Sequence, residues 1–129
     1  MELLILALIA VESGGKDNAI GDKHLAQKAY GCLQIRQPVC NDYNKAHGTK
    51  HQAKDCLGNR ELSVKICRWY LEHWCNPERL GRNPLLNDYL MIWRGGPNGW
   101  KQKPVPIDKE RLAKARAFIA KEEAKKKKK

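Results

Sequence analysis

The chain has 129 residues, enough for a single hydrophobic core and too few for several large domains. Hydrophobic residues make up 42% and charged residues 30%, with 10 Gly and 6 Pro, which excludes a collagen-like or low-complexity chain. The 25 Lys and Arg residues outnumber the 14 Asp and Glu residues, and residues 109–129 carry much of this excess. Such a balance favours a polyanionic partner, whether nucleic acid, anionic lipid or an acidic wall polymer.

The first predicted element is a buried helix over residues 3–13, where apolar side chains occur on nearly every side. This run is shorter than the ~20 apolar residues needed to cross a bilayer, so we expect no membrane insertion. It carries Glu2 where a signal peptide has basic residues, so no clear signal peptide is predicted. Ser13, Gly14 and Gly15 end the helix.

The middle of the chain alternates polar loops with helical patterns. Residues 16–28 are typical of a loop, and the apolar run 30–35 fits either a strand or the start of a helix, because periodicity cannot distinguish them in so short a stretch. A short helix and a polar loop are predicted over 38–50. A longer helix is predicted from about 59 to 75, ended by Asn76-Pro77.

The C-terminal third predicts two more helices. Asn83-Pro84 opens one that runs through Trp93, and residues 95–99 then have the composition of a turn. Asp108 is a candidate N-cap for a last helix through residue 124, and the terminal lysines repel one another. We therefore expect a predominantly α fold, a helical bundle around a central buried helix. Its main domain covers 1–106, a C-terminal helix 107–124 packs on or extends it, and 125–129 form a disordered lysine tail.

The cysteines predict neither a disulfide scaffold nor a metal site. Their number, five, leaves at least one thiol unpaired in a monomer, and no two form a close C-x-x-C pair. The pairing stays open: Cys40 with Cys75 is possible, whereas Cys67 and Cys75 lie too far apart along one predicted helix. Cys40, Cys56 and the two histidines between them match no tight zinc pattern, so no metal is expected.

Glu12 is the strongest candidate for chemistry. It ends an otherwise apolar helix and directly precedes Ser13-Gly14-Gly15, so its carboxyl group leaves the core where a glycine turn can open a cleft. Partial burial disfavours the charged form of a carboxyl group, so a protonated acid can persist near neutral pH and donate its proton to a leaving oxygen. A last-turn glutamate that merely faces water is the alternative interpretation.

Asp22 is the candidate partner of Glu12. The loop between them is long and glycine-rich enough to fold back, and two carboxylates in different surroundings are what glycoside hydrolysis needs. A turn-forming aspartate that bonds to its own backbone is the alternative.

Two further segments could line a cleft. Gln34 is an amide inside an apolar run, so it needs a hydrogen-bond partner, which either a sugar hydroxyl or the backbone would supply. Trp93 precedes the glycine-rich turn, whose small residues let a ligand approach the backbone closely. Trp93 is otherwise a core residue.

These motifs resemble the lysozyme-like superfamily. Glu12-Ser13-Gly14, the segment from Tyr30 to Ile35 and the turn at 95–99 resemble, in this order, the three motifs of soluble lytic transglycosylases and goose-type lysozymes. The turn and the Glu-to-Asp spacing are also similar to invertebrate-type lysozymes, and the compact form is similar to phage and bacterial muramidases. The resemblance covers about residues 3–100. It implies an α+β lysozyme-like fold with a small hairpin or sheet beside the cleft.

The resemblance implies that Glu12 is the general acid at the β-1,4 bond between N-acetylmuramic acid and N-acetylglucosamine. In lysozyme hydrolysis Asp22 would act as base or nucleophile, whereas a lytic transglycosylase would use Glu12 alone and release a 1,6-anhydro product. No cofactor or metal is implied. The expected substrate-binding residues line a groove for several sugar units: Ser13, Tyr30, Gln34, Ile35, Trp93, Arg94, Gly95, Gly96 and Asn98.

Two arginines depart from the family pattern. Arg94 stands where the family usually has asparagine, and its guanidinium could meet a muramyl lactate or a peptide carboxylate. Arg36 stands where goose-type enzymes carry a second aspartate, so Asp22 would have to act without that helper.

The expected partner is therefore the glycan strand of peptidoglycan, attacked by a monomer in the periplasm or outside the cell. Either a phage lysin made in the host cytosol or a trimmed form of a secreted enzyme fits this reading. The alternatives are a noncatalytic basic module that binds the wall or nucleic acid. No recognisable nucleic-acid motif accompanies the charge, so no specific nucleic-acid partner is expected.

Overall fold

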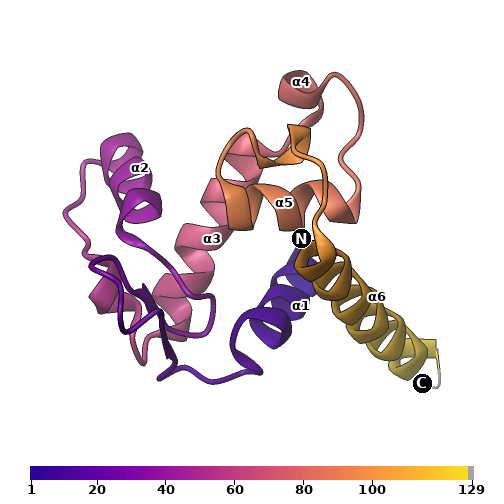
Figure 1. Cartoon of the computed structure of the whole chain (residues 1–129), viewed down its shortest axis with the longest axis horizontal. Helices are drawn as coiled ribbons and strands as arrows, with labels where there is room; N and C mark the ends of the chain where they lie inside the picture. The colour runs from indigo at the N-terminus through magenta and orange to yellow at the C-terminus, as the bar shows by residue number, and fades with distance from the viewer. Residues whose placement is uncertain (128–129) are drawn as a thin grey trace. The chain divides into compact units, whose positions relative to one another are not determined.

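The computed structural model describes residues 1–127 and is predominantly helical, with one two-stranded antiparallel sheet (Figure 1). The predicted α-rich class with a small sheet is confirmed at this level. The chain divides into two compact units, one formed by Met1–Val11 with the described residues from Leu71 onward, the other by Glu12–Tyr70. This division differs from the predicted boundary at residue 106, because the last helix belongs to the same unit as the first eleven residues.

Helix α1 (Glu2–Ser13) confirms the predicted N-terminal helix and its end. Ile5, Ala7 and Leu8 are almost completely buried, as a core helix requires. Leu6 is 45% exposed, however, so the prediction that the helix is enclosed on nearly every side was wrong.

The first unit continues with the end of α3 (Arg60–Trp74), α4 (Pro77–Leu80) and α5 (Leu86–Gly95). Asn76 does more than end α3, since its Oδ1 accepts the Arg79 N–H at 2.9 Å and caps α4. Helix α5 packs against both the 3-10 helix η2 (Gly99–Lys101) and α6 (Pro106–Lys127).

Helix α6 differs from its prediction at both ends. It continues through Lys127, so Lys125–Lys127 are helical rather than part of a disordered tail. Residues 128–129 of that predicted tail lie outside the described residues. At the other end, Asp108 is the third helical residue and not the N-cap. Its Oδ2 accepts the Val105 N–H at 2.9 Å, which satisfies an amide that the helix leaves unpaired.

Helix α5 begins in the same way as α6. Asp88 is its third residue, and Oδ2 of Asp88 accepts the Leu85 N–H at 2.7 Å. Both carboxylates are buried and each is held by an arginine, Asp88 by Arg82 and Asp108 by Arg94. The arginine Arg82 lowers the pKa of Asp88, because its hydrogen bonds favour the charged carboxylate.

The second unit contains the sheet. Strands β1 (Ile20–Gly21) and β2 (Ala29–Tyr30) pair antiparallel, with Ile20 opposite Tyr30. Tyr30 also forms an antiparallel bridge with Ile35, so the ambiguous run 30–35 is a strand end followed by a tight turn and not a helix start.

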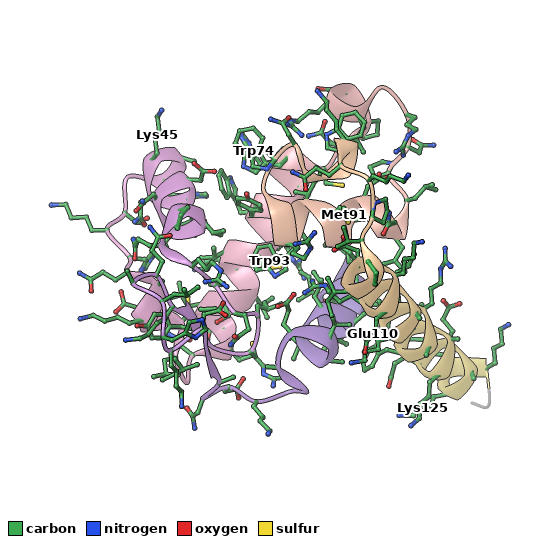
Figure 2. All side chains as sticks on the ribbon, in the orientation of Figure 1. Lys45, Trp74, Met91, Trp93, Glu110 and Lys125 are labelled. Carbon is green, nitrogen blue, oxygen red and sulfur yellow. The ribbon has the colours of Figure 1, made fainter. Side chains whose placement is uncertain are left out.

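Helix α2 (Gln37–His47), the 3-10 helix η1 (Ala53–Cys56) and the start of α3 complete this unit. η1 packs against both β2 and α2. Gly31 is required where β2 meets η1, because it has φ +81° and a Cβ there would lie 2.5 Å from the carbonyl oxygen of Cys56. The side chains of the whole described chain are drawn in Figure 2.

Candidate functional site

Glu12 lies in the last turn of α1 and is half-buried, in agreement with a carboxyl group partly withdrawn from water. Directly after it the chain turns through Gly14 and Gly15, which both have left-handed backbone angles. Ser13 supports this turn, since its Oγ accepts the N–H of Gly15 at 3.2 Å and of Lys16 at 3.1 Å. The predicted substrate ligand Ser13 therefore has a local structural role.

The loop after Glu12 is tied to the first turn of α3. Nε of Arg60 donates to Asp17 at 2.7 Å, and a second guanidinium nitrogen donates to the Gly15 carbonyl at 2.7 Å. The Gly58 N–H also donates to the Asp17 carbonyl at 2.8 Å. These bonds hold the glycine turn that follows Glu12 in one arrangement.

Cys67 of α3 is close enough to Glu12 for the two side chains to interact electrostatically. This thiol is completely buried, and burial raises its pKa, with the negative charge of Glu12 as the next largest cause. The carboxyl group of Glu12 therefore lies within electrostatic reach of a buried, uncharged thiol.

Asp22 directly follows β1 and has a left-handed φ of 55°. Its carboxylate forms an ion pair with Arg36, which also donates to the Gln27 carbonyl at 2.9 Å. Both charged side chains are partly exposed, at 36% for Asp22 and 41% for Arg36. Arg36, the residue that differs from the goose-type pattern, is thus the direct partner of Asp22. The bond from Arg36 occupies Oδ2, one of the two carboxylate oxygens of Asp22.

Gln34 and Ile35 lie beside Asp22 but offer little to a ligand. Nε2 of Gln34 donates to the carbonyls of Gly31 at 3.0 Å and Ala19 at 3.3 Å, so the backbone supplies the partner that a sugar was expected to supply. The Ile35 side chain is completely buried, which corrects its prediction as a substrate contact. Gln34 keeps only Oε1, which faces Gly21, for a further bond.

Tyr30 remains a good candidate for a ligand contact. It is half-buried, and the described residues include no hydrogen-bond partner for its hydroxyl group. It lines two surface hollows of about 340 and 260 Å³. The structure thus brings Asp22, Tyr30 and Gln34 together around one small sheet.

The predicted residues of the glycine-rich turn all belong to the other unit. Trp93 is only 9% exposed, so it is a core residue and not an aromatic platform for a sugar. Arg94 holds Asp108 through Nε and, at 3.0 Å, through Nη2, so its guanidinium has an internal carboxylate partner where a substrate carboxylate was predicted. A buried carboxylate requires such a partner, and the sequence shows no sign of it because the two residues lie fourteen positions apart.

The predicted turn at residues 95–99 is confirmed. Gly95 ends α5, Gly96 has φ +87°, and a Cβ at Gly99 would lie 2.1 Å from the carbonyl oxygen of Met91. Glycine at position 99 therefore allows the turn to lie directly against α5.

Arg79 is a residue that the sequence reasoning missed. Its guanidinium donates to the carbonyl of Pro97, to Oδ1 of Asn98 at 2.9 Å and to the carbonyl of Trp74 at 3.1 Å. It also lies 5.1 Å from the ring centre of Trp74. Asn98, predicted as a substrate ligand, thus has an internal partner. Arg79 lies eighteen positions from Pro97 and nineteen from Asn98, so no local pattern could have predicted these contacts.

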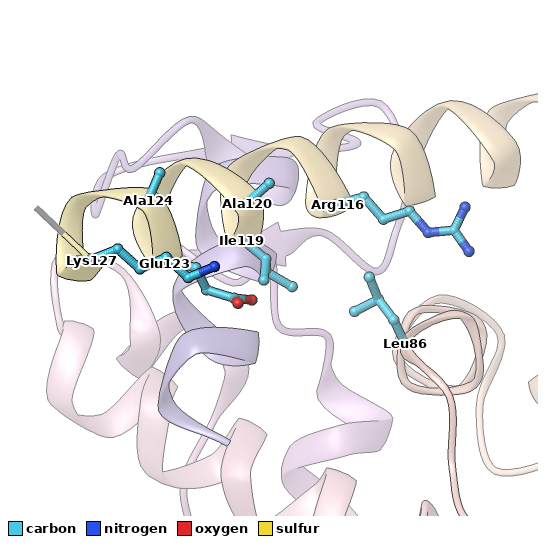
Figure 3. A pocket seen from close by; sticks show the side chains of 7 residues that line it. All are labelled: Leu86, Arg116, Ile119, Ala120, Glu123, Ala124 and Lys127. Atoms are coloured by element: carbon cyan, nitrogen blue, oxygen red, sulfur yellow. The ribbon is translucent and has the colours of Figure 1, made fainter.

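One further hollow, of about 370 Å³, lies between the first residue of α5 and the C-terminal half of α6. Figure 3 shows Leu86 and Ile119 facing each other across it. None of the predicted site residues lines it.

The described residues contain no cluster of three or more His, Cys, Asp or Glu side chains arranged to hold a metal ion. The thiols of Cys40 and Cys56 are hydrogen-bonded to each other. The ring of His47 stacks on Tyr43, with ring centres 3.9 Å apart. Across residues 1–127, none of the helices is both long and apolar enough to span a bilayer.

Comparison with known proteins found no family model that matches the sequence and no curated protein with significant similarity.

Proposed function

We propose that this chain is a peptidoglycan-degrading muramidase that cleaves the β-1,4 bond between N-acetylmuramic acid and N-acetylglucosamine. Glu12 is the general acid. The observation that supports this most is the position of Glu12, half-buried near the uncharged Cys67 and followed by a turn that backbone and side-chain bonds hold in place.

In the proposed reaction, the carboxyl proton of Glu12 passes to the glycosidic oxygen as the bond from that oxygen to the anomeric carbon breaks. The muramic acid ring is left with an electron-poor anomeric carbon. In hydrolysis a water molecule adds there and loses a proton to a base. In the transglycosylase reaction a hydroxyl group of the same sugar adds instead, and its proton returns to Glu12.

The Asp22–Arg36 ion pair bears on this choice. The guanidinium of Arg36 donates to Oδ2 of Asp22 and so occupies one of the two carboxylate oxygens. Hydrolysis with Asp22 as base or nucleophile therefore has to use a carboxylate that already has an arginine partner. The pairing therefore favours the second candidate, a lytic transglycosylase that uses Glu12 alone.

Purified peptidoglycan tests both parts of the proposal. We expect wild-type protein to release soluble fragments and Glu12→Gln to lose at least about a hundredfold in rate, since general acid catalysis contributes typically 10²–10⁴-fold. Circular dichroism should show an unchanged fold, and Glu2→Gln at the exposed start of α1 is the matched control. Full activity of Glu12→Gln would exclude Glu12 from the mechanism.

Mass spectrometry of the fragments separates the two chemistries. Reducing muramic acid ends indicate hydrolysis, whereas 1,6-anhydro ends indicate a transglycosylase. Asp22→Asn should abolish most of a hydrolase activity and leave a transglycosylase activity largely intact. Absence of any fragment from the wild-type protein would contradict the proposed function as a whole.

A further inference from the structure

The two hollows beside the sheet of the second unit adjoin each other. The larger, about 340 Å³, is lined by residues of the β1–β2 loop, α2 and η1, and the smaller, about 260 Å³, by Ile20, Lys23, Lys28 and Tyr30. Lys28 and Tyr30 line both. We call this pair of hollows the Tyr30 trough.

The Tyr30 trough is cationic. Lys23 and Lys28 line the smaller hollow, and Lys28 and Lys54 line the larger. Neither lining contains an aspartate or a glutamate. Within residues 1–127 these three lysines form no ion pair, so their charges are not neutralised by the protein.

The nearest acidic residues in sequence have other partners. Asp22 pairs with Arg36, and Oδ2 of Asp55 accepts the Gln52 N–H at 2.8 Å. The trough therefore combines three unneutralised ammonium groups with the hydroxyl group of Tyr30, which has no hydrogen-bond partner within residues 1–127. Because the site offers hydrogen-bond donors and positive charge but no carboxylate, it favours an anion that has hydrogen-bond acceptors.

We propose that the Tyr30 trough binds carboxylates of the short acidic peptide attached to the glycan strand. This inference rests on the proposed function and specifies its substrate, namely strands that still carry their peptides. The trough and Glu12 belong to the same compact unit, so a glycan strand bound at Glu12 and its peptide bound in the trough would contact one unit.

Binding of soluble fragments to full-length Glu12→Gln tests the assignment without cleavage. Isothermal titration calorimetry would compare a muramyl disaccharide bearing an acidic peptide with the same fragment after amidation of its carboxylates. The triple variant Lys23→Gln, Lys28→Gln, Lys54→Gln should bind the acidic fragment roughly fivefold to twentyfold more weakly, because each exposed ion pair contributes modestly. Its affinity for the amidated fragment should be unchanged.

The matched control removes the same charge from exposed lysines of the same unit that do not line the trough, Lys45, Lys50 and Lys65. Figure 2 shows Lys45 extending away from α2. This control should keep its affinity. An equal loss in both triple variants, or equal binding of acidic and amidated fragments, would overturn the inference.

Two further measurements distinguish a failure of this inference from a failure of the proposed function. Competition by inorganic phosphate at concentrations that leave peptide-free disaccharide bound would assign the trough to phosphate and overturn the carboxylate assignment. If wild-type protein cleaves peptidoglycan but the triple lysine variant binds the acidic fragment with unchanged affinity, only this inference is wrong. Absence of both cleavage and glycan binding would instead remove the proposed function.

Discussion

Replacing Arg94 with methionine tests whether this arginine serves the fold or a substrate. The substitution keeps an unbranched apolar side chain about as long as the hydrocarbon stem of arginine and removes the guanidinium from Asp108, whose side chain is only 2% exposed. Breaking a buried ion pair by removing one partner costs about 3–5 kcal/mol. Because the Arg94 side chain is 37% exposed, water can partly replace it, and we expect about 2–3 kcal/mol.

For a chain of this length, a loss of that size lowers Tm by roughly 8–12 °C, which differential scanning calorimetry at pH 7 would measure. The exposed Arg116 of α6, the helix that contains Asp108, provides the control, since Arg116→Met should change Tm by less than about 2 °C. An unchanged Tm in Arg94→Met would refute the reasoning, and weaker glycan binding at unchanged Tm would restore Arg94 to the substrate site.

The effect should also depend on pH. Burial acts to raise the pKa of Asp108, but hydrogen bonds from Arg94 and from the Val105 N–H outweigh it and lower the pKa. The stabilisation from Asp108 is therefore present above its unfolded pKa of about 3.9 and is lost as the pH falls through the lower folded value. The Tm difference between wild type and Arg94→Met should therefore be constant above about pH 5 and shrink as the pH falls below the unfolded pKa of Asp108.

Two other predictions concern the turn and the thiols. Gly99→Ala should cost at least about 2 kcal/mol in urea unfolding, since its Cβ would lie 2.1 Å from the Met91 carbonyl oxygen, whereas Gly95→Ala meets only the flexible Gln102 side chain at 3.3 Å. Equal stability of the two variants would contradict the observed packing. Burial raises the pKa of Cys75 to about 12, and all five thiols are buried, so native protein at pH 7 should resist N-ethylmaleimide labelling that denatured protein completes within minutes. Rapid labelling of the native thiols would disprove their burial.

Local signals in the sequence were sufficient for most helices. The end of α1 at Ser13 follows from the two glycines behind it, and the boundary between α3 and α4 follows from Asn76-Pro77. Both signals act within a few residues, so they do not depend on how the chain folds back on itself. The position of Glu12 at a helix end was predictable for the same reason.

The polar partners of the candidate site were not predictable in this way. Arg36 reaches Asp22 and Arg94 reaches Asp108 only because the chain reverses between them. Gln34 likewise reaches the carbonyl of Ala19 only because the chain turns back between them, and it also bonds to the carbonyl of Gly31. Residue type indicated that each group needed a partner. The identity of that partner depends on the tertiary structure.

The two buried aspartates at the starts of α5 and α6 make the first unit vulnerable to acid at defined places. Asp88 and Asp108 each bond to a backbone amide three residues earlier and to an arginine. Protonation of either carboxyl group removes both kinds of bond at once. Acid unfolding of this unit should therefore begin by fraying at Leu85 and Val105, a local event that amide hydrogen exchange would detect before the core opens.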